Sequence, residues 1–178
     1  RWITEARAFA EHAVRHFHDA DTGLFNFTSD QDPALITRPM EVHDNVIPAS
    51  NSSMANGLFI LGTLFDDERY LTLNDRATQA GTANMTGHPT GHSHWAQGLL
   101  MRAFPFHTIA ITGPEAHDLR RGFAPHYLPN RLFMGGTASS TLPLLKDKHL
   151  PTSTIFVCVE NNCQLPVHTV DAAVQQIR

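Results

Sequence analysis

The sequence predicts a mainly α-helical protein that ends in a small α/β segment. In the first hundred residues, apolar side chains recur at helical spacing in several stretches, and irregular loops separate them. After Pro105 the pattern changes to short apolar runs with β-branched residues, which alternate with helical stretches. We therefore divide the chain into a helical part, residues 1–104, and an α/β part, residues 105–178.

The helical part is expected to contain four helices. Each of them has one apolar stripe, and the glycines and prolines between them indicate loops. Ser50 precedes the second stripe and has the side chain of a helix N-cap. The expected helices are residues 2–17, 50–64, 66–85 and 93–104.

The α/β part is expected to form strands at residues 107–112, 131–134 and 154–159. Helices are expected from Gly113 toward Phe123 and over residues 170–177. Strands that alternate with helices are typical of parallel sheets, so we expect a short and mostly parallel sheet.

Composition excludes some classes of partner. Among 178 residues, 13 are Lys or Arg and 17 are Asp or Glu, and the formal net charge is −4 without a basic block. We therefore expect no nucleic-acid partner. The apolar runs are far shorter than the roughly 20 residues of a spanning helix, so we expect no membrane partner. Only two cysteines are present, and we expect a cytoplasmic protein.

The chain has 12 histidines, so metal binding has to be considered. His88, His92 and His94 could converge, but no Asp, Glu or Cys stands beside them at ligand spacing. Cys158 and Cys163 are two thiols, and a tetrahedral zinc site needs four ligands. We expect no metal and no other cofactor, and we expect Cys158 to be a buried free thiol.

A polar loop between the first two helices has the residue types of a ligand pocket. Its carboxylates and imidazole could transfer protons, and its amides and hydroxyl could bind sugar hydroxyls. The candidate catalytic residues are Asp44, Glu41 and His43, and the candidate substrate-binding residues are Asn45, Ser50 and Asn51. In the alternative interpretation, Asp44 only accepts backbone N–H bonds and Ser50 only caps a helix.

Several motifs resemble the C-terminal region of thioredoxin domain-containing proteins of the spermatogenesis-associated type. They are residues 44–52 (DNVIPASNS), 64–70 (LFDDERY) and 155–167 (IFVCVENNCQLPV). Residues 107–113 (HTIAITG) and 127–129 (YLP) also fit, so the resemblance spans nearly the whole chain.

The resemblance implies that residues 1–104 are part of an α/α toroid of helical hairpins, similar to N-acylglucosamine 2-epimerases and six-hairpin glycosidases. It also implies an upstream thioredoxin-like domain as a partner. The chain enters an amphipathic pattern directly at Arg1, and we expect it to begin within a longer protein. The expected function is carbohydrate-active or sugar-binding, with a carbohydrate ligand near Asp44. The alternative is a non-catalytic scaffold or substrate-presenting module for the thioredoxin-like domain.

Overall fold

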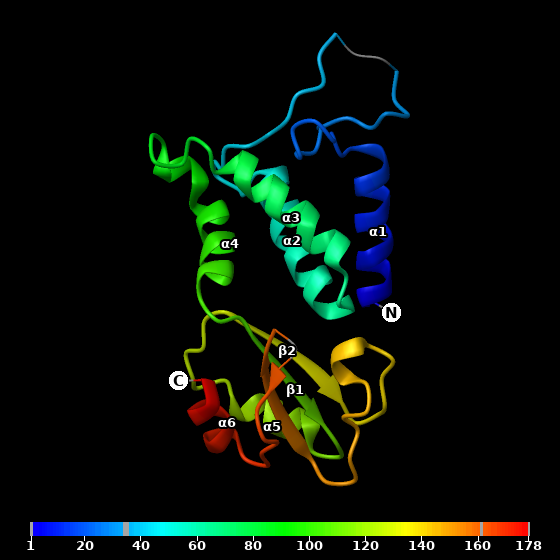
Figure 1. The fold of residues 1–178 in the computed structure, drawn as a ribbon, viewed down its shortest axis with the longest axis vertical. Helices are drawn as coiled ribbons and strands as arrows, with labels where there is room; N and C mark the ends of the chain where they lie inside the picture. Colours follow the sequence, from blue (N-terminus) through cyan, green and yellow to red (C-terminus); the bar gives the residue numbers. More distant parts are fainter. Residues whose placement is uncertain (1, 34–35, 161, 178) are drawn as a thin grey trace. The chain divides into compact units, whose positions relative to one another are not determined.

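A computed structural model describes residues 2–33, 36–160 and 162–177. The chain forms two compact units, Arg1–Leu99 and Leu100–Arg178, and each is described by itself. The division lies five residues before the end of the predicted helical part. Figure 1 shows the elements of both units along the chain.

The helical unit is organised around one antiparallel hairpin. Helix α2 (Ser50–Phe65) ends at Asp66, which has a left-handed backbone, and α3 (Glu68–Gly81) starts directly afterwards. The Asp67 carboxylate accepts the Arg69 N–H at 3.1 Å and so caps α3. The other helices are α1 (Trp2–His16), the short η1 (Pro89–His92) and α4 (Ser93–Ala103), which continues into the second unit.

The core of the helical unit consists of two apolar clusters. One joins α1 to the hairpin through Ala10, Leu58 and Tyr70. The other surrounds Trp95 of α4, which is 1% exposed and donates its indole N–H to Val42 O at 2.7 Å. The loop before α2 is therefore anchored to α4.

The second unit contains a four-stranded sheet with the order β2-β1-β3-β4. Its central pair, β1 and β3, is antiparallel, while β1 and β2 are parallel. The strands are β1 (His107–Thr112), β2 (Arg131–Gly136), β3 (Thr154–Val159) and β4 (Asn162–Cys163).

Alternating side chains of the strands pack on opposite faces of this sheet. Ile109, Ile111 and Val157 face a cluster that includes residues of α5 (Ala116–Gly122) and α6 (Val170–Ile177). Ala110 and Phe156 point to the other face, where η2 (Pro143–Leu145) contributes Leu145. Both faces of the two central strands are thus covered, which explains their continuous apolar runs.

The predicted toroid of helical hairpins is wrong. The described residues form six α-helices and a mixed four-stranded sheet, and the helical unit has one close hairpin, α2–α3, flanked by α1 and α4. A single apolar stripe on a helix shows that one side is buried, but it does not specify the number or closure of helix pairs. The mostly parallel sheet is also wrong, because β1–β3 and β3–β4 are antiparallel.

The expected free thiol at Cys158 is likewise wrong. Cys158 is buried, as expected, but it forms a disulfide with Cys163, its partner in the register of β3 and β4. Strand β4 has only two residues, too few to produce a period-2 pattern that could be recognised in the sequence.

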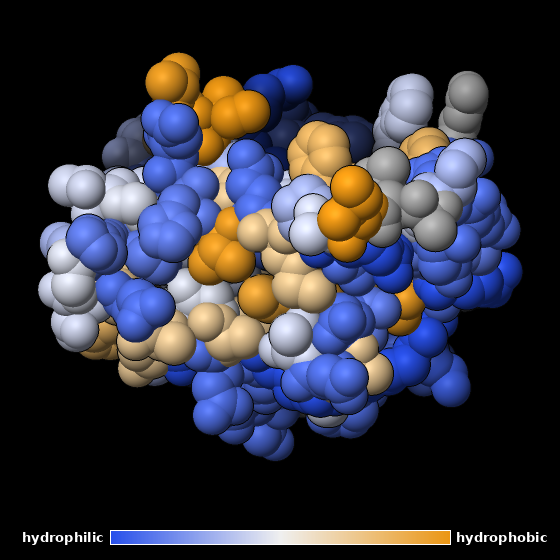
Figure 2. Space-filling view, turned by 90° about the horizontal axis from the view of Figure 1, so that it is seen from above, coloured by the Kyte–Doolittle hydropathy of each residue, from blue (hydrophilic) through white to orange (hydrophobic). Residues whose placement is uncertain are grey.

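The loop between α1 and α2 carries several exposed apolar residues. Phe27, Val46 and Ile47 belong to this group. In Figure 2, hydrophobic residues are scattered among polar ones on the face shown. Within the described ranges, the helices lack the length and apolar character needed to span a bilayer.

Candidate functional site

Asp44 lies where the N-termini of α2 and α4 meet. Its Oδ1 accepts the Ala49 N–H at 2.8 Å and the Ser52 hydroxyl at 2.7 Å. Its Oδ2 accepts the His94 N–H at 2.8 Å. Because Ala49 precedes α2 and His94 is in the first turn of α4, one carboxylate satisfies N–H groups at both helix starts.

The surroundings of Asp44 favour its charged form. The side chain is buried, with 7% of the residue exposed, and this burial raises the pKa of the carboxyl. The hydrogen bonds from Ala49, Ser52, His94 and Trp95 together lower the pKa further than burial raises it. The net effect is a pKa below the ordinary value, so the site holds a carboxylate anion.

Ser52 and His94 extend this network. His94 Nδ1 lies 3.1 Å from Ser52 Oγ, and His94 Nε2 lies 3.2 Å from the Asn56 amide nitrogen. When Asn56 donates to Nε2, Nδ1 carries the proton and donates to Ser52, whose own proton points to Asp44.

This order differs from that of a catalytic triad. In a triad the carboxylate binds the histidine, and the histidine accepts the serine proton. Here the carboxylate of Asp44 binds Ser52 directly, and Ser52 is 0% exposed. Ser52 is therefore neither activated by His94 nor accessible to a substrate.

Glu41 has a role similar to that of Asp44. Its Oε2 accepts the Ser50 N–H at 2.9 Å. Ser50 does not cap α2 as expected, since it is the first helical residue and the N-cap, Ala49, makes no side-chain bond. The two predicted catalytic carboxylates therefore supply the acceptors at the start of α2 that a capping serine would otherwise provide.

Asn51 is fully buried and joins three backbone groups. Its Oδ1 accepts the Phe25 N–H at 2.7 Å, and its Nδ2 donates to Phe25 O and Glu41 O, each at 2.9 Å. These bonds use both ends of the amide. Asn51 therefore holds the loop between α1 and α2 against the first turn of α2.

His43 and Asn45 are exposed, as is Glu41. The His43 ring lies 5.1 Å from the His92 ring and 6.5 Å from the His88 ring, measured between centroids. His92 Nδ1 is bonded to His88 O at 2.8 Å. Across the described residues, no three His, Cys, Asp or Glu side chains form a group suited to a metal ion.

The structure thus distributes the six predicted residues between two environments. Asp44 and Asn51 are buried in hydrogen-bonded positions, whereas Glu41, His43, Asn45 and Ser50 lie at the surface. Sequence reasoning missed the contacts of Ser52 and His94 with Asp44. The His94 contact depends on the packing of α4, whereas Ser52 lies only eight residues after Asp44. Only the position of Ser52 in the first turn of an expected helix could have suggested a polar role.

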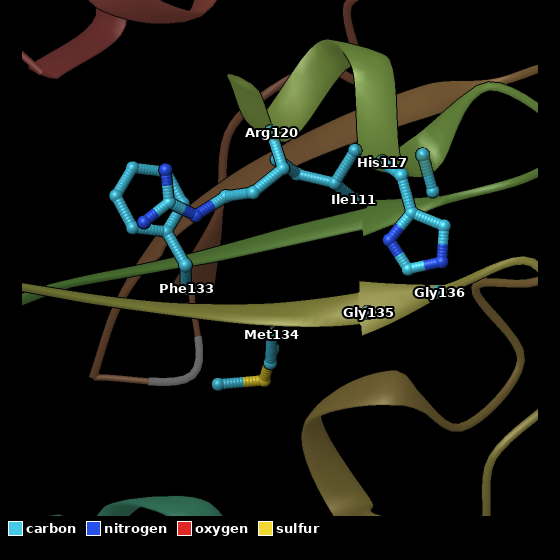
Figure 3. A pocket seen from close by; sticks show the side chains of 8 residues that line it. Ile111, His117, Arg120, Phe133, Met134, Gly135 and Gly136 are labelled. Atoms are coloured by element: carbon cyan, nitrogen blue, oxygen red, sulfur yellow. The ribbon is translucent and has the colours of Figure 1, made fainter. Parts of the chain in front are cut away.

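A separate pocket lies in the second unit, between α5 and β2. It has a volume of about 160 Å³. Figure 3 shows Arg120 and Phe133 at one end and the imidazole of His117 at the other, near Gly136. The sequence did not single out any of these residues as a candidate, and their cationic and apolar atoms give this pocket a mixed lining.

The sequence was compared with models of protein families and with curated proteins, and neither comparison identified a relative. No model of a protein family matches the chain, and no curated protein is similar to it in sequence. The resemblance to thioredoxin domain-containing proteins therefore stays a prediction.

Proposed function

We propose that the helical unit is a non-catalytic scaffold in which the loop of residues 41–52 positions helices rather than a substrate. The observation that carries this proposal is the saturation of the Asp44 carboxylate by Ala49, Ser52 and His94. These are the contacts of the structural alternative, in which Asp44 accepts backbone N–H bonds.

Acid–base catalysis by Asp44 has little chemical support. A general acid or base must exchange a proton with the substrate and works best with a pKa near the operating pH. The hydrogen bonds to Asp44 move its pKa in the opposite direction, and both carboxylate oxygens already have protein partners. A buried anion of this kind stabilises the helix N-termini that surround it.

The proposed partner of the scaffold is the upstream thioredoxin-like domain that the sequence resemblance implies, and the proposed compartment is the cytoplasm. The disulfide between Cys158 and Cys163 is relevant to this compartment, because the reducing conditions of the cytoplasm keep most cysteine pairs as thiols. In the cytoplasm we therefore expect a substantial fraction of this pair to be reduced.

Carbohydrate binding is the second candidate. The observation in its favour is that Glu41, His43 and Asn45 are exposed polar residues on one short segment. Such side chains can bind sugar hydroxyls without Asp44 taking part.

One pair of variants separates the scaffold from a sugar site. Asp44→Asn is expected to lower the free energy of unfolding by about 1 to 3 kcal/mol, because an amide cannot accept all of the present bonds. The matched control, Asp21→Asn, changes an exposed carboxylate and should stay within about 0.5 kcal/mol of the parent chain.

Titration with glucose and N-acetylglucosamine completes the test. The scaffold predicts no saturable sugar binding by the parent chain or by either variant. Saturable binding of either sugar by the parent chain would refute the scaffold and support the sugar site. Binding that persists in Asp44→Asn would assign the sugar contacts to the exposed side chains of the loop, and binding that is lost there without a change in stability would assign them to Asp44.

A further inference from the structure

The pocket between α5 and β2 lies on the α5 side of the sheet, near the carboxyl ends of two parallel strands. Ile111 is near the end of β1, and Gly135 and Gly136 end β2. The chain passes from β1 through α5 to β2, so α5 borders the pocket.

The close approach of β2 to β1 helps to shape the pocket floor. Gly135 has a φ of +132°, and a Cβ at this position would lie 1.8 Å from Ile111 O. A side chain is therefore excluded there, and backbone is exposed between Phe133 and the end of the strand. The Met134 side chain points away from α5 in Figure 3 and packs on the opposite face of the sheet.

Arg120 is exposed and supplies a positive charge at one end of the pocket. Its guanidinium carbon lies 3.9 Å from the centroid of the Phe133 ring, so the planar group stacks on the aromatic face. Stacking leaves the N–H groups at the edge of the guanidinium available to an acceptor. The nearby acid Asp118 is instead paired with Arg121.

His117 stands one helical turn before Arg120 and lines the same pocket. Ile111, Ala116 and Phe133 contribute apolar atoms to the lining. A cationic fork beside an apolar wall matches a molecule with a carboxylate at one end and a hydrophobic body at the other.

Volume and charge limit the ligand further. Pockets for drug-sized ligands usually measure about 300 Å³ or more, so 160 Å³ is suited to a smaller molecule. The chain carries a net charge of −4, and a general attraction of anions to its surface is therefore not expected. Affinity for an anion has to come from local contacts.

We propose that this pocket binds a small carboxylic acid with a short apolar or aromatic body. Arg120 binds the carboxylate at its end of the pocket, and Ile111, Phe133 and the imidazole of His117 contact the body. This site is independent of the polar loop in the helical unit and of the proposed scaffold role.

The test is a titration of the full 178-residue chain with benzoate, propionate and inorganic phosphate. Binding is monitored by the chemical shifts of the backbone amide NMR signals of Ile111, Gly135 and Gly136. Saturable shifts of these signals with benzoate or propionate are expected. Arg120→Gln should weaken binding by about tenfold or more, because a charge-assisted bidentate contact is lost.

Arg121→Gln is the matched control, since it removes the same charge from the next residue of α5. It should change affinity by less than about twofold, because Arg121 does not line the pocket and can attract the ligand only by electrostatic interaction through solvent, which salt screens. Thermal melting of both variants checks that they are folded. His117→Ala removes an exposed ring that lines the end of the pocket opposite Arg120. It is expected to weaken binding about threefold to tenfold through lost contact with the apolar body, which provides a second probe if Arg120→Gln is unstable.

Three results would overturn the proposal. The first is the absence of saturable shifts at the pocket amides. The second is an equal loss of affinity in Arg120→Gln and Arg121→Gln, which would show attraction by charge alone. The third is phosphate binding as tight as benzoate binding, which would show an anion site without recognition of the apolar body.

Discussion

Gly81, the last residue of α3, lies directly against the indole of Trp95 in α4. A Cβ at residue 81 would be 2.3 Å from Trp95 Cζ2, which is closer than van der Waals contact permits. Trp95 is 1% exposed and bonded to Val42 O, so its ring has little room to move. The absence of a side chain at Gly81 is thus a requirement for packing α4 on the hairpin.

Gly81→Ala is therefore expected to destabilise the chain by about 3 kcal/mol, because a methyl group would overpack a filled core. Gly57→Ala is the control from the interior of α2, where a Cβ would meet no atom within 4 Å. This change should stabilise the chain by about 0.5 to 1 kcal/mol through helix propensity. Urea denaturation measures the free energy of unfolding of both variants. Equal effects of the two substitutions would contradict the packing argument.

These glycines also show how far the sequence could predict the fold. A glycine inside a helix favours close packing, but the sequence pattern does not show which glycine has a close neighbour. In the structure Gly62 lies against Leu71 and Gly81 against Trp95, whereas Gly57 is open. Helical spacing identifies a buried stripe, but the partner of each position depends on contacts distant in the chain.

The same limit applies to the sheet. Strands 107–112 and 154–159 and the helix 170–177 were predicted with the bounds that the structure has. Local patterns do not encode strand direction, however, so the antiparallel pairing of β1 with β3 could not be predicted. The candidate site shows this too, since acceptance of backbone N–H bonds by Asp44 was predicted only as an alternative to catalysis. The sequence did not indicate the contact of Asp44 with His94 or the bond from Ser50 N–H to Glu41.

The stability of the helical unit should depend on the ionisation of Asp44. Its folded pKa is below the unfolded value of about 3.9, so its contribution is fully present above that value and is lost as the pH falls through the folded pKa. The difference in unfolding free energy between the parent chain and Asp44→Asn should therefore shrink below about pH 4. Denaturation series from about pH 6 to about pH 3 measure it. A difference that stays constant over this range would show that the carboxylate charge is not involved.

Reduction of the disulfide should destabilise the second unit. Cys158 and Cys163 are five residues apart, and the entropy of closing so short a loop corresponds to about 2 kcal/mol. A reductant should lower the melting temperature of the parent chain. The reductant should not change the melting temperature of the Cys163→Ser variant, since that variant lacks the disulfide and its substitution is at an exposed position. If mass spectrometry shows full reduction and the melting temperature stays the same, the bond does not stabilise the fold.

The two asparagines of the polar loop provide the sharpest comparison between a binding site and a scaffold. Asn51 and Asn45 were both predicted to bind substrate, yet Asn51 is fully buried and Asn45 is exposed. Asn51→Ala removes the partners of Phe25 N–H, Phe25 O and Glu41 O. Each unsatisfied buried group costs about 1 to 3 kcal/mol, so a loss of about 3 kcal/mol or more is expected.

Asn45→Ala should change the free energy of unfolding by less than about 0.5 kcal/mol, because its side chain is at the surface. A sugar site that uses both residues predicts the opposite pattern, in which both variants lose sugar affinity and neither loses stability. Urea denaturation together with glucose titration of the two variants distinguishes these outcomes. A stable Asn51→Ala variant would show that the loop holds its position on α2 without this side chain. It would contradict the scaffold interpretation of residues 41–52, because Asn51 makes three of the hydrogen bonds that hold this loop.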